Sequence, residues 1–412
     1  MKVKSRHIVI RKHPEIQPCT ISVPSSKSES NRALIINALT KNSMVNNLST
    51  ARDTQTMLRL LESNEHVLDV IDAGTTMRFL TAYFAVTGQD KILTGTKRMC
   101  ERPIGILVDA LREVGADIEY LGNEGYPPLR TKGFRNSGIN TLRIRGDVSS
   151  QYISAILMVS PLLENGLTLE LTGKTGSKPY IDMTLGIMKH FGVSAVFDKN
   201  IIAIPEQNYH TTTFTVDPDW SGASYWYSMV ALGREASIFL KGFHLPSYQG
   251  DSIIKDLMID LGVKSTFTDN GIELTKSSFK KSVEIDFSDN PDLAQTIAVV
   301  CSCKGIHARF SGLESLRIKE TDRIAALQNE LSKLGSQLIE ENANEWELIP
   351  ATTISKSKKL VFNTYDDHRM AMAFAPIATI ADISIENPAV VQKSYPSFWD
   401  DLNKAGFNTE LI

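Results

Sequence analysis

The hydrophobic and polar positions repeat in a fixed order at four places along the chain. At each place an amphipathic helix ends at a glycine, and alternating apolar and polar residues follow, as in a half-buried strand. The four segments are residues 108–120, 185–197, 254–267 and 327–339. Their glycines, Gly115, Gly192, Gly262 and Gly335, are 70 to 77 residues apart. Such self-similarity predicts an architecture built from copies of one β/α module, with a period too long for a simple solenoid.

Further strands and helices are predicted between these segments. The helices begin after small polar residues and are apolar on nearly every side, which is typical of buried helices. The strand segments are residues 141–145, 167–171, 237–241 and 282–287, and the helix segments are residues 74–84, 149–158 and 220–227. We predict an α/β protein of two domains with a boundary near Asp217–Asp219. Residues 16–216 would form the N-terminal domain, and residues 1–15 with 217–412 the C-terminal domain.

The composition is that of an ordinary globular protein. The 412 residues are 42% hydrophobic and 22% charged, and the net charge of −3 gives no general attraction to nucleic acid or to an anionic membrane. No apolar run approaches the roughly 18 residues of a membrane span, and the first ten residues lack the apolar core of a signal peptide. The four cysteines are too few for a disulfide framework. We expect a cytoplasmic monomer that binds neither nucleic acid nor membrane.

One helix start carries cations where they should be unfavourable. Ser26 and Glu29 have the spacing of a capping box, which predicts a helix that begins at Lys27. Lys27 then lies in the first turn, where the helix dipole is already positive, and Arg32 lies on the same face as Ser28. An anion held by backbone N–H groups, hydroxyls and the two cations would explain this pattern. A solvated helix start is the other interpretation.

Other segments share this property: residues 72–78, 101–105, 316–323 and 366–375, and the loop around Lys393. Each has a simpler explanation when taken alone. Lys319 and Arg323 could be surface residues neutralised by Glu320 and Asp322, and Asp292 could serve only the helix dipole after Pro291. Together, five or six such helix starts in a slightly acidic protein favour a small substrate that carries phosphate and carboxylate groups.

Other chemistries lack their motifs. The eight histidines show no zinc-binding spacing, and neither a nucleophile elbow nor a dinucleotide-binding glycine motif occurs. Gly173–Thr175 resembles the end of a phosphate-binding P-loop, but Thr168 stands where that motif requires its first glycine. We therefore expect no cofactor and no metal.

The segments, taken in order, resemble the EPSP synthase family, the 3-phosphoshikimate 1-carboxyvinyltransferases of the shikimate pathway. The matching segments run from Pro24 to Lys393 and so cover nearly the whole chain. They are S-K-S-E-S-N-R at 26–32, A-G-T-T-M-R at 73–78, R-M-C-E-R-P-I at 98–104, S-S-Q at 149–151, S-K-P-Y-I-D at 177–182, K-E-T-D-R at 319–323 and D-H-R-M-A-M at 367–372.

The resemblance implies a fold and a reaction. Two similar domains, each a threefold repeat of β/α units with parallel buried helices, would close on the substrates. The 5-hydroxyl of shikimate 3-phosphate would attack C2 of phosphoenolpyruvate while C3 is protonated, and the adduct would then expel phosphate. Proton transfers in both directions require positioned acid–base groups, and two polyanions in one site require dense positive charge.

The resemblance also implies which residues serve each substrate. Lys27, Asp292 and Glu320 would be catalytic, with Asp292 as the base and Glu320 as the acid. Shikimate 3-phosphate would be bound by Lys27, Ser28, Arg32, Ser149, Ser150, Gln151, Ser177, Asp292 and Lys319. Phosphoenolpyruvate would be bound by Lys27, Gly74, Arg102, Gln151, Arg323, Arg369 and Lys393. His368 would assist.

Some positions depart from the family pattern. Asp72 stands where asparagine is common and adds negative charge beside a phosphate site, Thr76 and Phe79 make a bulkier helix start, and Ser315 replaces an asparagine. Two other functions remain open. One is enolpyruvyl transfer to UDP-N-acetylglucosamine, against which Ser149, Ser150 and the S-K-P-Y-I-D segment argue. The other is a non-catalytic anion-binding protein on the same scaffold.

Overall fold

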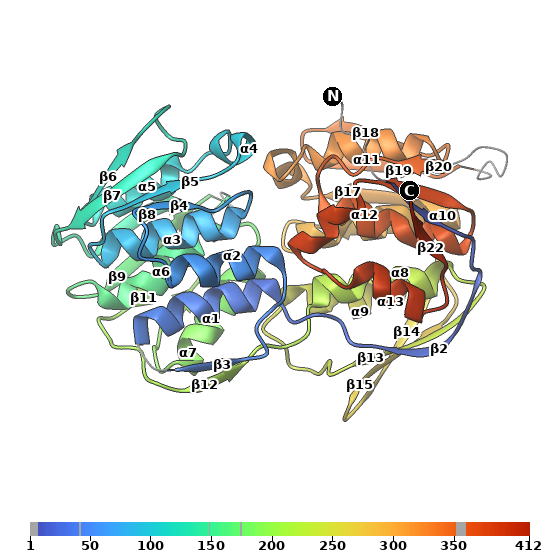
Figure 1. Cartoon of the computed structure of the whole chain (residues 1–412), viewed down its shortest axis with the longest axis horizontal. Coiled ribbons are helices and arrows are strands. Elements are labelled where there is room, and N and C mark those ends of the chain that lie inside the picture. Colours follow the sequence, from blue (N-terminus) through green and yellow to red (C-terminus); the bar gives the residue numbers. More distant parts are fainter. Residues whose placement is uncertain (1–6, 41–42, 148, 174, 352–359) are drawn as a thin grey trace. The chain divides into compact units, whose positions relative to one another are not determined.

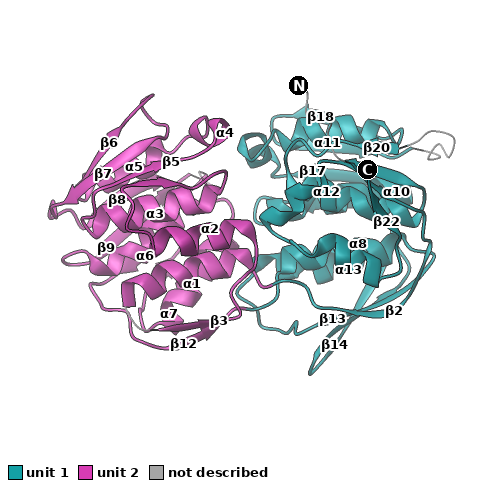
Figure 2. Cartoon of the chain, in the orientation of Figure 1, with its two compact units in different colours: residues 1–24, 217–412 teal, residues 25–216 magenta. Residues whose placement is uncertain are grey.

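The chain folds into two compact units. The computed structural model describes residues 7–40, 43–147, 149–173, 175–351 and 360–412 (Figure 1). Unit 1 comprises residues 1–24 and 217–412, and unit 2 comprises residues 25–216 (Figure 2). Residues 16–24, which we assigned to the N-terminal domain, group with unit 1. The reason is that β2 (Glu15–Ile21) pairs in parallel with β13 (Glu235–Lys241).

Unit 2 repeats one arrangement of strands and helices. In two of its modules two parallel strands are joined by a buried helix, and a second helix leads into an antiparallel hairpin. The first comprises β4 (Val67–Asp69), α3 (Gly74–Val86), β5 (Lys91–Thr94), α4 (Lys97–Cys100), α5 (Gly105–Glu113), β6 (Ala116–Tyr120) and β7 (Leu129–Phe134). The second comprises β8 (Thr141–Arg145), α6 (Ser150–Val159), η1 (Ser160–Leu162), β9 (Leu167–Thr172), α7 (Lys178–His190), β10 (Val196–Asp198) and β11 (Ile201–Ile204).

The third module of unit 2 is smaller. Its strands β3 and β12 form a parallel pair. It comprises α1 (Lys27–Thr40), β3 (Met44–Asn46), α2 (Arg52–Leu61) and β12 (Thr213–Thr215).

Unit 1 contains three modules, each with a four-stranded sheet. The first comprises β2, α8 (Trp220–Leu232), β13, η2 (Gly250–Ile253), α9 (Ile254–Leu257), β14 (Val263–Thr268) and β15 (Gly271–Lys276). The second comprises β16 (Ser282–Asp286), η3 (Pro291–Leu293), α10 (Ala294–Lys304), β17 (His307–Ser311), η4 (Glu314–Ile318), α11 (Arg323–Ser332), β18 (Gln337–Asn342) and β19 (Glu345–Ile349). The third comprises β1 (His7–Ile10), β20 (Leu360–Phe362), α12 (His368–Phe374), η5 (Ala375–Thr379), β21 (Ile383–Glu386), η6 (Pro388–Lys393), α13 (Phe398–Lys404) and β22 (Thr409–Leu411).

These modules confirm the predicted α/β fold of repeated units. The strands alternate as expected; in β8, for example, Leu142 and Ile144 enter the core and their neighbours are exposed. The apolar helices α3, α6 and α8 are almost wholly buried, because each fills the interior of its unit. The helix predicted at residue 254 is shorter than expected, since α9 is a single turn. None of the helices in the described ranges has the length and hydrophobicity to span a bilayer.

The four repeat glycines all have positive φ, as the predicted helix ends require. Gly115 has φ +115, and a Cβ atom there would lie 1.9 Å from the backbone oxygen of Arg135. Gly88, in the same unit, has φ +69, but a Cβ atom there would come no closer than 3.9 Å to Phe134 N. Alanine substitutions at the two positions therefore separate two losses of stability: the loss caused by a left-handed backbone and the loss caused by a clash with another backbone segment.

Gly115→Ala should lower the free energy of unfolding by about 3 kcal/mol, since the clash with a fixed carbonyl adds to the left-handed strain. Gly88→Ala should lower it by about 1 to 2 kcal/mol through strain alone. Urea denaturation followed by circular dichroism measures both values. An equal loss of unfolding free energy in the two variants would mean that the close approach of the Arg135 backbone oxygen to Gly115 does not affect stability.

Candidate active site

Except for Arg32, in the second turn of α1, the predicted substrate-binding residues of unit 2 lie at the starts of four helices or in the loop before a fifth. Lys27 opens α1, Gly74 opens α3, Ser150 opens α6, and Ser177 immediately precedes α7. The helices α3, α6, α7 and α1 pack on one another, so the residues belong to one connected bundle (Figure 1). Helix starts carry free N–H groups and partial positive charge. The bundle therefore offers several anion-binding ends.

Helix α1 begins at Lys27, as the capping box predicts. The Glu29 backbone N–H donates to Ser26 Oγ at 3.3 Å. The Lys27 side chain is 15% exposed, and its Nζ lies 3.3 Å from Asp53 Oδ2 on α2. Lys27 is therefore a mostly desolvated cation held next to a carboxylate, which is unlike a solvated helix start.

Arg32 is buried inside unit 2. Its guanidinium donates to Thr184 Oγ1 at 2.7 Å, to Ser154 Oγ at 3.0 Å and to the Ser28 backbone oxygen at 3.0 Å. Burial lowers the pKa of Arg32 to about 10. These bonds tie α1 to α6 and α7, so Arg32 fixes the positions of the helix starts as well as carrying charge.

Two aromatic rings lie beside the Arg32 guanidinium. Its Cζ is 5.4 Å from the Phe79 ring centroid and 5.9 Å from that of Tyr180. Phe79 is one of the departures from the family pattern, and its ring supports this cation. Tyr180 was not among the predicted site residues, although it stands in the S-K-P-Y-I-D segment. Its half-buried side chain beside Arg32 makes it a further candidate.

Arg102 lies against the start of α3. A Cβ atom on Gly74 would come within 2.6 Å of Arg102 Nη1, so only the absence of a side chain allows the guanidinium its place. The next carbonyl, that of Pro103, accepts bonds from Arg78 Nη2 and the Tyr152 hydroxyl, which fixes the Arg102 loop. The helix that follows this loop, α5, begins two residues after the proline, at Gly105.

The start of α6 connects to that of α3. Ser149 caps α6 by accepting a bond from the Gln151 backbone N–H, and Ser150 is buried. Gln151 Nε2 donates to Thr75 Oγ1 at 3.2 Å. Ser177 has left-handed φ and ψ of 54° and 36° and is half-buried. Thus Ser149, Ser150 and Gln151 share one helix start, which is bonded to the helix start beside Arg102.

Asp72, the acidic departure, is paired with a cation. Arg52 Nη2, on α2, lies 2.8 Å from Asp72 Oδ1 and 2.9 Å from Asp72 Oδ2. The neighbouring Asp53 pairs with Lys27, and its backbone oxygen accepts a bond from Thr76 Oγ1. The start of α2 therefore balances charges around the start of α3. Ser315, another of the departures, is exposed in η4.

Unit 1 brings a second group of predicted residues together around Arg323. Only 2% of the Arg323 side chain is exposed, although it opens α11, so it is not a surface residue. Its guanidinium donates to Asp367 Oδ2 at 2.6 Å, to Glu320 Oε2 at 3.0 Å and to Asp292 Oδ1 at 3.1 Å. Three carboxylates from separate segments thus converge on one buried cation.

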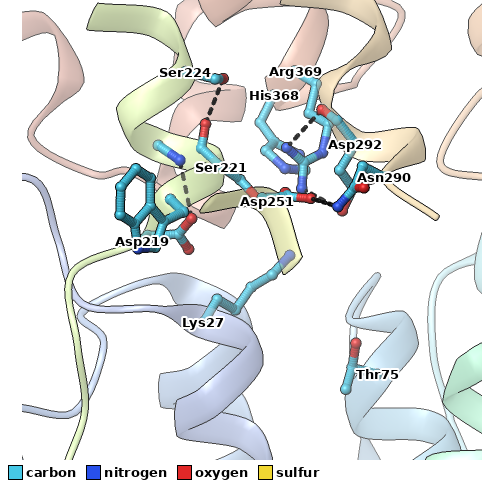
Figure 3. A network of polar contacts seen from close by, with 12 residues as sticks. Lys27, Thr75, Asp219, Ser221, Ser224, Asp251, Asn290, Asp292, His368 and Arg369 are labelled. Atoms are coloured by element: carbon cyan, nitrogen blue, oxygen red, sulfur yellow. Dashed lines mark hydrogen bonds and ion pairs between the residues drawn. The ribbon is translucent and has the colours of Figure 1, made fainter. Parts of the chain in front are cut away.

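Arg369 pairs with the Asp292 carboxylate (Figure 3). The same carboxylate also accepts a bond from Arg323. Its Nη2 lies 2.6 Å from Asp292 Oδ2, and its Nη1 donates to the Asp292 backbone oxygen at 3.3 Å. Asp367 caps α12 by accepting a bond from the Arg369 backbone N–H at 2.9 Å. The buried His368 lies beside it, with Nδ1 3.6 Å from Asp367 Oδ1.

Glu320 bridges two cations. Besides Arg323, Lys393 Nζ lies 3.6 Å from Glu320 Oε1. Lys393 is buried at the end of η6, a 3₁₀ helix where we expected a loop, and Lys319 is half-buried beside Glu320. A small anion could replace a carboxylate at these cations without adding a buried charge. The arrangement therefore suits the exchange of a side-chain carboxylate for a substrate phosphate or carboxylate.

Comparisons with known proteins agree in pointing to one family. A family model described as EPSP synthase (3-phosphoshikimate 1-carboxyvinyltransferase) matches residues 59–402. A Bacteroides fragilis protein named 3-phosphoshikimate 1-carboxyvinyltransferase is 50% identical over 399 residues, which cover 95% of this chain and 96% of the relative. A protein of the same name from Neisseria meningitidis serogroup B is 35% identical over 416 residues, which cover 93% and 95%.

The fold has solved counterparts. A structure titled EPSP synthase from Acinetobacter baumannii has a TM-score of 0.78 at 20% identity, and the alignment covers 99% of this chain and 100% of that one. A second such structure has a TM-score of 0.76 at 19% identity. These likenesses confirm the predicted fold.

Proposed function

The chain belongs to the EPSP synthase family, and we propose that it transfers the enolpyruvyl group of phosphoenolpyruvate to the 5-hydroxyl of shikimate 3-phosphate. The products are 5-enolpyruvylshikimate 3-phosphate and phosphate, in the biosynthesis of chorismate and the aromatic amino acids. The observation that carries this proposal is the 50% identity, over 95% of the chain, to a relative with that name. The two clusters of basic residues supply its physical basis.

The residues of unit 2 bind both substrates. Ser28, Arg32, Ser149, Ser150 and Ser177 hold shikimate 3-phosphate, since hydroxyls and helix-start N–H groups suit a phosphate monoester. Lys27 and Gln151 contact both substrates. Arg102 binds phosphoenolpyruvate, and Gly74 allows close approach of the backbone. The support is that these side chains and helix starts belong to one bundle connected by hydrogen bonds.

The residues of unit 1 bind phosphoenolpyruvate and move protons. Arg323, Arg369 and Lys393 hold its phosphate and carboxylate, and Lys319 contacts shikimate 3-phosphate. When those anionic groups bind the arginines, they compete with the Asp292 carboxylate that both arginines now hold. Asp292 then binds the shikimate hydroxyls and accepts the proton of the attacking one, while Glu320 protonates C3. His368 assists beside Asp367.

The two rival functions have less support. The relatives are named for shikimate 3-phosphate chemistry and not for a nucleotide sugar. A non-catalytic anion-binding protein would have no need to keep Asp292 and Glu320 at the same buried arginine.

Phosphate release tests the proposed function directly. Purified protein is incubated with phosphoenolpyruvate, with and without shikimate 3-phosphate, and inorganic phosphate is measured over time. We expect release only with both substrates, together with a product that retains the shikimate phosphate by mass spectrometry. Release that does not depend on shikimate 3-phosphate, or that requires UDP-N-acetylglucosamine instead, would refute the proposal.

Arg52 supports phosphoenolpyruvate binding by balancing the charge of Asp72. Arg52→Ala should raise the KM for phosphoenolpyruvate about 5- to 10-fold, because one uncompensated charge near the anion is worth roughly 1 kcal/mol where water screens it, as at these partly exposed side chains. Asp72→Asn in the same chain should restore that KM, since the charge and its partner are then both gone. Steady-state kinetics at saturating shikimate 3-phosphate measure the effect.

The matched control is Arg59→Ala. Arg59 lies on the same helix, but its guanidinium donates to the Asp69 backbone oxygen. Removing it should leave the KM within about twofold of wild type, as for an ordinary surface charge. Failure of Asp72→Asn to rescue Arg52→Ala would contradict the charge balance.

We also place the reaction in the cytoplasm and assign it to a monomer that binds neither nucleic acid nor membrane. The free cysteines among the described residues, including the buried Cys301, support a reducing compartment. Analytical ultracentrifugation with and without substrates tests the oligomeric state.

A further inference from the structure

A buried carboxylate that the proposed mechanism does not use lies next to Asp292. Asp251, in η2, is 4% exposed. Its Oδ1 accepts a bond from Asn290 Nδ2 at 3.1 Å, and its Oδ2 accepts a short bond from the Ser221 hydroxyl, in the first turn of α8 (Figure 3). Asp251 therefore joins three segments that are distant in the sequence.

The bond to Asn290 controls the turn that carries Asp292. Asn290 immediately precedes η3, and its backbone oxygen accepts a bond from the Leu293 N–H at 3.1 Å. Pro291 has a fixed φ, so the direction of Asp292 follows that of Asn290. On the other side of the turn, the Asp292 backbone oxygen accepts a bond from Arg369 Nη1. The turn is thus fixed at both ends by side chains from outside it.

The burial of the Asp251 carboxylate is unfavourable for folding. Burial raises its pKa to about 6, and the negative charge of Asp292 contributes in the same direction. The side chains that donate to it, Ser221 and Asn290, are both uncharged. The nearby Arg369 lowers the pKa of Asp251, but burial outweighs it, so burying this carboxylate costs free energy. Its position is better explained by what it holds in place than by stability.

We propose that Asp251 is a positioning residue for Asp292, which it orients by anchoring Asn290. The inference rests on the proposed function, in which Asp292 is the base. A base displaced by about 1 Å can lose a factor of about 100 in rate. Asp251 would position Asp292 through its hydrogen-bond acceptor and not through its charge. An amide of the same shape at position 251 should therefore perform the same role as the carboxylate.

The experiment compares the full-length chain with Asp251→Ala, Asp251→Asn and Asn290→Ala. We expect Asp251→Ala and Asn290→Ala to lower kcat about 10- to 100-fold, with the KM for phosphoenolpyruvate within about threefold of wild type. Asp251→Asn should keep kcat within about threefold, because its Oδ1 can still accept from Asn290 and its amide can donate to Ser221. The double variant Asp251→Ala/Asn290→Ala should be no slower than the slower single variant, since both remove one interaction.

Asp401→Ala is the matched control. Asp401 is a carboxylate of unit 1 that is as buried as Asp251, at 2% exposed, and it also accepts a bond from a serine, Ser397. It lies on α13 and is paired with Lys404 as well. Its loss should reduce thermal stability and leave kcat within about threefold, because its bonds to Ser397 and Lys404 do not reach the turn that carries Asp292. Asn290 is half-buried, so Asn290→Ala gives an answer even if Asp251→Ala fails to fold.

Any of three results would overturn the inference. The first is an unchanged kcat in Asn290→Ala, and the second is an equal loss of kcat in Asp251→Asn and Asp251→Ala. The third is a loss of kcat in the double variant that equals the product of the two single losses. Each of these results is a ratio of the kcat of a variant to the kcat of an active wild type. A wild type that shows no phosphate release dependent on shikimate 3-phosphate would refute the proposed function itself, so the two failures are distinguishable.

Discussion

Glu320→Gln should lower kcat by a factor of about 100 or more, within the usual range for a lost acid–base group. Glutamine keeps the length and shape of the side chain and can still accept the bond that Arg323 Nη2 donates at 3.0 Å. It cannot deliver a proton to C3 of phosphoenolpyruvate or take one back. The KM values should therefore change by less than about fivefold, because the loss falls on an interaction made in the transition state. Lys27→Ala should reduce turnover to a similar extent.

Deuterium incorporation separates this loss from a general disturbance of the site. In D₂O the wild type should exchange the methylene protons of phosphoenolpyruvate through the reversible addition step, and proton NMR should show no exchange in Glu320→Gln. Asp322→Asn is the matched control. Asp322 lies two residues away and caps α11 with Oδ1 bonds from Ile324 and Ala325, which an asparagine can also accept. If Glu320→Gln retained both turnover and exchange, Glu320 would not be the acid.

Several of the repeated modules could be predicted because they carry a local signal. A positive-φ glycine between an amphipathic helix and an alternating strand marks four of them in the sequence. A fifth example, Gly406 between α13 and β22, escaped prediction. Its helix has only seven residues and its strand three, too few to show a period. The neighbouring strand β1 comes from the other end of the chain, which no local pattern reveals.

That arginines and lysines gather at helix starts could likewise be predicted, but their partners could not. Helix starts with arginine or lysine are visible in short segments. The carboxylates that hold Arg323 lie 31 and 44 residues away, at Asp292 and Asp367, and Arg52 lies 20 residues before Asp72. Such pairs depend on which helix starts meet in the folded unit, and spacing along the chain does not encode this. For the same reason Asp251 and Tyr180 did not stand out in the sequence.

Gly74 offers the sharpest test of how tightly the site is packed. Gly74→Ala should raise the KM for phosphoenolpyruvate about 10- to 100-fold, the loss expected when a charge-assisted contact worth roughly 1.5 to 3 kcal/mol is disturbed. The added methyl group would lie 2.6 Å from Arg102 Nη1 and 3.1 Å from its Cζ, so the guanidinium has to move. Arg102 is 9% exposed and its loop is tied down at Pro103, which leaves it little room to adjust.

The effect should be specific to phosphoenolpyruvate. The KM for shikimate 3-phosphate should stay within about threefold, since the three atoms nearest to the added methyl group all belong to Arg102 and none to the proposed ligands Arg32 and Ser177. Gly133→Ala is the matched control, because a Cβ atom on that glycine of β7 would meet nothing within 4 Å. Isothermal titration calorimetry of the complex with shikimate 3-phosphate would separate weaker phosphoenolpyruvate binding from slower chemistry. Unchanged binding in Gly74→Ala would mean that Arg102 does not contact phosphoenolpyruvate, and the role proposed for the start of α3 would have to be withdrawn.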